Sequence, residues 1–154
     1  MASYTYSFLD CQAAIKDEAG SFSLGNGAGA AEEGISISYV DDKGSLMTGA
    51  DGQGMHSLHA GKAGTVTVRV LKTSPVNAQL SDLYNATTQS GADYGRSTIS
   101  VRDPVRGDEI TCQGCGIRKH PDIAFAKDGG LQEWVWNAAQ VDVKLGTGQP
   151  SAVI

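Results

Sequence analysis

A short stretch near the middle of the chain constrains the fold most strongly. Valine alternates with threonine or arginine through residues 65–70, and this period of two predicts a strand with one buried face. The preceding residues 49–64 are rich in glycine, and Ser74 with Pro75 can begin a helix soon after the strand. A glycine-rich loop, a strand and a helix start are therefore expected in direct succession.

The helix predicted after this strand carries one apolar stripe. Apolar or small residues recur at the three- and four-residue spacing of one helix face: Val76, Leu80, Leu83, Tyr84 and Thr87. Because that stripe needs an apolar partner, we expect the helix to flank a sheet.

Alternation elsewhere predicts further strands and hairpins. These lie at residues 4–15, 21–24, 35–39, 99–102, 109–113, 123–125 and 134–145. The side of the strand that is apolar changes near Leu9 and again near Ala139, which predicts a bulge at each place. Residues 25–34 and 41–64 show little periodicity and are expected to be irregular, and Arg106-Gly107-Asp108 is expected to be a hairpin turn.

Length and composition favour one mainly β domain spanning residues 1–154. The chain has 154 residues, with 20 glycines and only 6% aromatic residues, which favours strands and turns over long helices. A formal charge of −5 without a basic cluster argues against tight nucleic-acid binding. No signal peptide or apolar membrane segment is recognisable, so a soluble protein made in a cytoplasm is expected.

Cysteine and histidine residues offer one alternative chemistry. Cys112 and Cys115 have the spacing of half a zinc site, and His120 is near in sequence. A structural zinc site needs four ligands, and no second pair of this spacing exists, so a buried Cys112 and an incidental turn thiol at Cys115 are favoured. His56 and His59 lack the glutamate of a metalloprotease helix, and neither a cofactor nor a metal is expected.

Four segments of the chain together resemble one known family. These are SYTYSFLDCQAAI, FSLGNGAGAAEEGISI, GADGQGMHSLHAGKAGTVTVRVLKTSPVNAQL and AKDGGLQEWVWNAAQVDVKLGTG. They resemble the tail tube proteins of contractile-tailed bacteriophages, and the likeness covers nearly the whole chain. No active-site motif is involved, so a structural protein rather than an enzyme is implied.

The resemblance implies a fold and an assembly. The fold would be an antiparallel β-sandwich or barrel-like domain with one flanking helix and a long glycine-rich stacking loop. Six copies would form a ring, and rings would stack into the inner tube of the virion after assembly in the host cytoplasm. Sheath, tape measure, baseplate and tail terminator proteins are the implied partners, and phage DNA would pass through without specific binding.

The resemblance also suggests where the contacts lie. The family's long loop reaches the next ring, and the corresponding segment here is Asp41–Lys62. Its implied stacking residues are Met47, Met55, His56, Leu58 and His59. A lumen that lets DNA slide calls for carboxylates and few cations. The candidate lumen carboxylates are Glu32, Glu33, Asp41, Asp42, Asp108 and Glu109.

Two other functions stay open at this point. One is the tube subunit of a bacterial contractile injection system, which differs in cargo and host but not in physics. The other is a small thiol- or metal-dependent enzyme that uses Cys112, Cys115 and His120.

Overall fold

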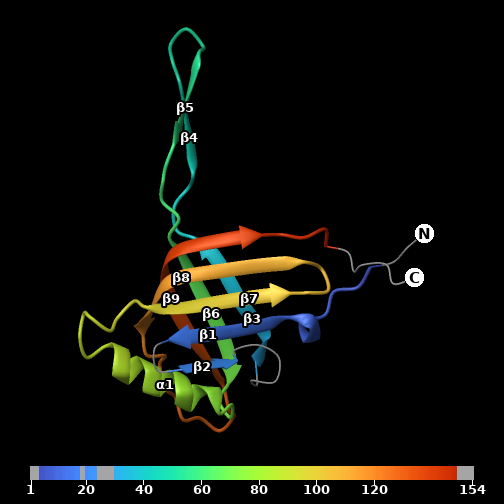
Figure 1. The fold of residues 1–154 in the computed structure, drawn as a ribbon, viewed down its shortest axis with the longest axis vertical. Helices are drawn as coiled ribbons and strands as arrows, with labels where there is room; N and C mark the ends of the chain where they lie inside the picture. The colour runs from blue at the N-terminus through green and yellow to red at the C-terminus, as the bar shows by residue number, and fades with distance from the viewer. Residues whose placement is uncertain (1–3, 18–19, 24–29, 149–154) are drawn as a thin grey trace.

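The computed structural model describes residues 4–17, 20–23 and 30–148, and Figure 1 shows their arrangement. One antiparallel sheet has the strand order β2-β1-β7-β8-β9-β6-β3, and β4 pairs with β5 in a separate two-stranded sheet. The strands are β1 (Gln12–Asp17), β2 (Gly20–Ser23), β3 (Ala30–Tyr39), β4 (Gly44–Thr48), β5 (Gly54–Leu58), β6 (Gly64–Leu71), β7 (Ser97–Asp103), β8 (Asp108–Lys119) and β9 (Leu131–Lys144). The mainly β, antiparallel fold class predicted from the sequence is confirmed.

Strand β9 joins two layers of the sheet. Its first part pairs with β6 from Leu131 to Ala138, whereas its pairing with β8 extends from Val135 to Lys144. In Figure 1, β6 and β3 cross steeply behind β1, β7 and β8. The sheet therefore coils on itself, and the side chains between its layers form the core.

The central strand is placed as its alternation predicts. Val66, Val68 and Val70 are fully buried, while the intervening residues are partly exposed. They pack in one cluster with both tryptophans of β9. The other large, fully buried side chains of this core are Ile15, Leu80, Ile99, Cys112, Cys115 and Val141.

The predicted helix is confirmed as α1 (Val76–Thr87). The Ser74 hydroxyl accepts a hydrogen bond from the Val76 backbone N–H at 3.3 Å, so Ser74 satisfies one of the free donors of the first turn. The predicted stripe is buried at Val76, Leu80, Leu83 and Thr87. In Figure 1, α1 lies across the end of the molecule opposite to the β4–β5 hairpin.

The N-terminal strand begins later than predicted. Tyr4 and Tyr6 are 53% and 70% exposed and belong to no strand, and a short 3-10 helix (Phe8–Asp10) occupies the position of the predicted bulge near Leu9. Regular pairing starts at Gln12, and β1 then forms the predicted hairpin with β2. The alternation of the first residues is not used to bury a face.

Two neighbouring predictions have different outcomes. Ile35–Tyr39 form a strand as expected and pair with β6, but β3 already begins at Ala30, within the segment predicted to be irregular. The register of β3 with β6 shifts between Ala30 and Ile35, which marks a bulge or irregularity in this part of the strand. Residues 24–29 of that segment lie outside the described residues.

The predicted change of buried face in β9 occurs at Val141 only, because Val143 and Leu145 are exposed, and the bulge lies in another strand. Ala138 and Val141 are both buried, yet β9 keeps one register with β8 across this point. The extra residue is in β8, where Cys112 and Cys115 oppose Ile99 and Ser97 of β7. Gly114 lies between them with φ +64°, the conformation that a glycine adopts without strain.

The prediction of a short strand at residues 123–125 is wrong. The connection from β8 to β9 has no regular secondary structure there, and Ile123 and Phe125 are 59% and 89% exposed. Both side chains point to solvent, so their alternation reflects no buried face.

Candidate assembly surfaces

The segment predicted to be an irregular loop is a β-hairpin. Strands β4 and β5 pair from Gly44 with Leu58 to Thr48 with Gly54, and Figure 1 shows the hairpin projecting far from the main sheet. At its base, the His59 N–H donates to the Lys43 carbonyl at 2.8 Å. Because nearly every residue of the hairpin is exposed, its sequence carries no alternation of buried and exposed positions to predict it.

The turn of the hairpin explains part of its glycine content. The Gly49 N–H donates to the Gln53 carbonyl at 2.8 Å, and the Gly52 N–H donates to the Gly49 carbonyl at 3.0 Å. Gly52 has φ +87°, and an Asp51 carboxylate oxygen accepts from the Gln53 N–H at 3.2 Å. The hairpin is thus built by local hydrogen bonds within one chain, which corrects the expectation of an irregular segment.

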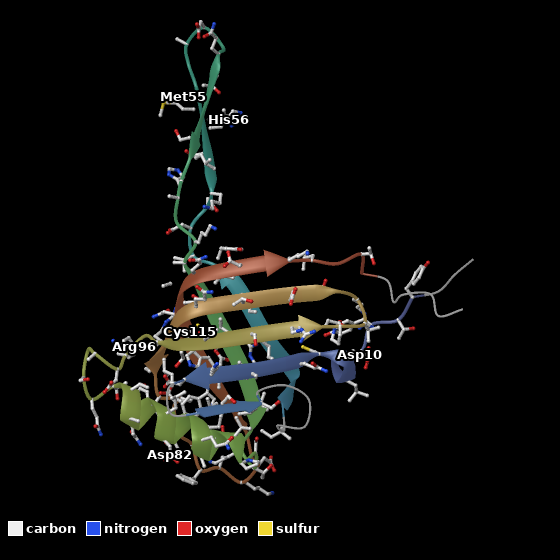
Figure 2. All side chains as sticks on the ribbon, in the orientation of Figure 1. Asp10, Met55, His56, Asp82, Arg96 and Cys115 are labelled. Atoms are coloured by element: carbon white, nitrogen blue, oxygen red, sulfur yellow. The ribbon has the colours of Figure 1, made fainter. Side chains whose placement is uncertain are left out.

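The hairpin has an apolar side chain pair on each face. Met47 and Met55 are directly opposite one another, and directly paired residues lie on the same face. Leu46, paired with His56, lies on the other face together with Leu58 at the base. Figure 2 shows Met55 and His56 pointing to opposite sides of the ribbon.

Large apolar side chains in this setting indicate a contact surface. Leu46, Met47, Met55 and Leu58 are between 58% and 87% exposed. The structure brings the predicted Met47 and Met55 together, places His56 on the opposite face, and puts His59 beyond β5 with Nε2 3.5 Å from the Ser45 hydroxyl. Sequence reasoning missed Leu46. Apolar surface on both faces is typical of a segment that becomes covered from two sides.

The edges of the main sheet provide a second kind of contact surface. β2 and β3 are the first and last strands of its order, so among the described residues each has a strand neighbour on one side only. β3 is the longer of the two, with ten residues against four. Unpaired backbone groups along a strand edge are able to pair with a strand of another chain.

The structure places the predicted carboxylates on separate elements. Asp41 and Asp42 lie at the base of the hairpin and line a groove of about 500 Å³. Asp108 and Glu109 begin β8, where an Asp108 carboxylate oxygen accepts from the Gly146 N–H at 3.0 Å. The side chains of Glu32 and Glu33 lie outside the described residues, although their backbone belongs to β3.

Both cysteines of the Cys-x-x-Cys pair lie in the core. The prediction of a buried Cys112 holds, but Cys115 is also buried and lies in strand β8 rather than on a turn. Figure 2 labels Cys115 on the sheet. Burial raises the pKa of Cys112 to about 11 and that of Cys115 to about 12, so neither is a thiolate at neutral pH. No group of three metal-ligating side chains occurs within the described residues.

His120 has a packing role in the structure. Its ring lies edge-on to Tyr84 and Trp134, with centroids 5.6 Å and 5.0 Å away. Its Nε2 is 3.3 Å from the Ser81 hydroxyl of α1. These contacts attach the β8–β9 connection to the helix.

Arg106 joins the β7–β8 turn to the N-terminal segment. The turn predicted at Arg106-Gly107-Asp108 is confirmed by Gly107, with φ +84°. The guanidinium is only 7% exposed and lies 2.9 Å from Asp103 and 3.1 Å from Asp10. It also donates to the Thr5 carbonyl and lies 5.0 Å from the centre of the Tyr6 ring. This cluster holds the first residues of the chain against the sheet.

The Arg106 cluster predicts a loss of stability in acid. Burial by itself would raise the pKa of Asp103, but the hydrogen bonds and charge of Arg106 outweigh it and hold that pKa below its ordinary value. A carboxylate with a lowered folded pKa stabilises the fold fully above its unfolded pKa of about 3.9, and this contribution disappears as the pH falls through the folded value. We therefore expect Asp103→Asn to lower the free energy of unfolding at pH 7. We also expect that free energy to fall less steeply with decreasing pH in the variant, measured by urea unfolding between pH 7 and pH 2. Parallel curves for the two proteins would contradict this role.

The described residues contain no helix with the length and apolar character that crossing a bilayer requires.

Comparison with known families identifies the family of the chain. The model of the family described as Bacteriophage PhiTE tail tube protein matches residues 1–146. The chain belongs to this tail tube family. No curated protein matches the sequence. The resemblance inferred from the sequence is therefore confirmed, and with it the tail tube fold.

Solved structures of similar fold include chains of an extracellular contractile injection system and of an anti-feeding prophage. A chain of the sheath-tube complex of the PVC extracellular contractile injection system is 15% identical, with a TM-score of 0.58 over 92% of this chain and 93% of that one. A chain of the PVC sheath/tube terminator is 15% identical, with a TM-score of 0.59 over 94% and 99%. A chain of the anti-feeding prophage tube-terminating cap is 9% identical, with a TM-score of 0.57 over 95% of each chain. At these identities the likeness concerns the fold.

Proposed function

We propose that this tail tube protein is the subunit of the inner tube of a contractile phage tail, with six copies in each ring and rings stacked along the tube. The observation that carries the proposal is the β4–β5 hairpin, which projects from the sheet with apolar side chains on both faces. A segment of this kind is suited to reach a neighbouring ring. Met47, Met55, His56, Leu58 and His59 are proposed stacking residues, and Leu46 joins them.

Pairing of sheet edges is the proposed contact within a ring. β2 of one subunit and β3 of the next are the two strand edges at the ends of the sheet order. Their pairing would satisfy backbone groups that otherwise need water and would remove both edges. A cyclic arrangement of this heterologous contact closes without a free edge.

The lumen is proposed to be lined by carboxylates. With six copies, the formal charge of a ring is 6 × (−5) = −30. Repulsion between carboxylates and phosphates acts over a Debye length of about 8 Å at physiological salt, which keeps DNA from adhering to the wall. Glu32, Glu33, Asp41, Asp42, Asp108 and Glu109 remain the proposed lumen residues.

The proposed partners follow from the same role. The family match supports a place in the tail of a virion, and the solved structures of similar fold include sheath–tube, terminator and cap assemblies. We infer contacts with sheath, tail terminator, tape measure and baseplate proteins after assembly in the host cytoplasm. The likeness to injection-system tubes favours one second candidate, the tube subunit of such a particle, which neighbouring genes would distinguish.

Electron microscopy of the purified protein tests the proposal. We expect concentrated protein to form six-fold rings and tubes in negative stain, because both kinds of contact are carried by one chain. A helical reconstruction of the tubes would then show which of the proposed carboxylates face the lumen. Protein that stays monomeric at all concentrations, or closes into rings with another number of subunits, would contradict the proposed hexameric tube.

A further inference from the structure

A second group of exposed apolar side chains lies far from the hairpin. Leu71 at the end of β6 is paired with Leu131 at the start of β9, and the neighbouring β8–β9 connection presents Ile123 and Phe125. Their exposed fractions are 45%, 50%, 59% and 89% in the order Leu71, Leu131, Ile123 and Phe125. We call these four residues the far-end patch.

The connection that carries Ile123 and Phe125 is fastened to the body of the protein. The Lys72 ammonium lies 4.1 Å from the centre of the Phe125 ring and donates to the Ala124 carbonyl. The Lys72 N–H donates to the Gly130 carbonyl at 3.2 Å, and His120 packs between Tyr84 and Trp134 at the start of the connection. An exposed phenylalanine held in place in this manner forms a preformed contact surface.

The far-end patch and the hairpin lie at opposite ends of β6. Gly64, at the start of β6, is paired with Tyr39 next to the hairpin base, whereas Leu71 is the last residue of the strand. Seven steps of about 3.3 Å separate the two ends by about 23 Å, and Figure 1 shows the hairpin and the β8–β9 connection at opposite ends of the molecule. Two different apolar surfaces at opposite ends are the geometry of a head-to-tail contact between identical subunits.

We propose that the far-end patch receives the β4–β5 hairpin of a second copy of this chain, with its Met47–Met55 face against Phe125. This inference rests on the proposed tube function and adds the site that the hairpin binds. Flexible thioethers pack favourably against an aromatic ring.

Leu46 and Leu58, on the hairpin face opposite to Met47 and Met55, are available for a second contact. When the methionine face lies on the far-end patch of one subunit, Leu46 and Leu58 face away from it. A second subunit of the receiving ring, next to the one that carries the occupied patch, would cover these two leucines. Each hairpin would then lie between two subunits of the next ring, which locks the rotation of one ring against the other.

Disulfide trapping between two populations tests the proposed contact. Both populations carry Cys11→Ser, because Cys11 is only partly buried, while Cys112 and Cys115 stay in the core. One population carries Met55→Cys and the other Phe125→Cys. We expect a disulfide-linked dimer on oxidation of the mixture under assembly conditions, and at least tenfold less from either population alone. Met55→Cys mixed with Leu145→Cys is the control, because Leu145 is 70% exposed but follows the opposite end of β9 from Leu131.

The outcomes separate this inference from the tube function itself. We expect Phe125→Ser to leave a folded subunit that elongates tubes at least tenfold less, and Leu145→Ser to assemble like the unchanged protein. Normal tubes from Phe125→Ser without the 55–125 disulfide would overturn the far-end patch and leave the tube function standing. A dominant 55–55 disulfide would also overturn it, since that product indicates a symmetric contact. Unchanged protein that forms neither rings nor tubes would overturn both proposals.

Discussion

A subunit whose hairpin is replaced by a two-residue turn is expected to fold and to form no tubes. Residues 42–61 would be replaced by Asn-Gly, a pair that favours the tight turns of two-residue hairpins. The chain segments on either side of the deletion are already close together, because Tyr39 is paired with Gly64 and the Val40 N–H donates to the Ala63 carbonyl at 3.1 Å. Nearly all deleted residues are exposed, so the free energy of unfolding should change by less than about 1 kcal/mol.

The deletion needs a control that keeps the hairpin and changes only its surface. Met47→Ser with Met55→Ser removes one apolar pair, and Ser45→Ala with Ser57→Ala changes the adjacent pair on the same face. Circular dichroism, urea unfolding and negative-stain microscopy would be applied to all three variants. We expect tubes from the serine-to-alanine variant and none from the other two. Loss of the folded signal in the deletion variant would mean that the hairpin is part of the folding unit.

Substitution of Gly64 by valine is expected to cause a large loss of stability. Gly64 is buried and paired on both sides, with Tyr39 of β3 and Ala138 of β9. An added Cβ would lie 2.5 Å from Val141 Cγ2 and 2.8 Å from the Ser38 carbonyl oxygen. Overpacking usually costs about 1–3 kcal/mol, and we expect more than about 3 kcal/mol here because one clashing atom belongs to the backbone of a paired strand.

Matched variants separate this steric effect from a general effect of losing glycine. Gly91→Ala is the control, because a Cβ at that position has no atom within 4 Å. Gly64→Ala with Val141→Ala removes the side-chain clash but keeps the one with Ser38, so it should recover only part of the lost stability. Thermal unfolding and soluble yield would be compared. Equal stability of Gly64→Val and the unchanged protein would show that the strands separate there at little cost.

The sequence alone determined the parts of the fold that bury one face against a core. The valines of β6, the stripe of α1 and the change of face in β9 were all predictable, because burial of alternate or every third to fourth residue leaves a periodic pattern. The family resemblance was equally accessible, since it depends on residue identities along nearly the whole chain.

Only the tertiary structure decided the features that leave no periodic pattern of buried residues in the sequence. The β4–β5 hairpin is exposed on both sides and therefore leaves no alternation in the sequence. Cys115 is buried because Gly114 adds a residue to β8 and turns the strand. The residues of the far-end patch are distant in sequence: β6 and β9 pair Leu71 with Leu131, and Lys72, the residue after Leu71, lies over the Phe125 ring. Contacts between distant segments depend on how the sheet coils, and local periodicity carries no record of that geometry.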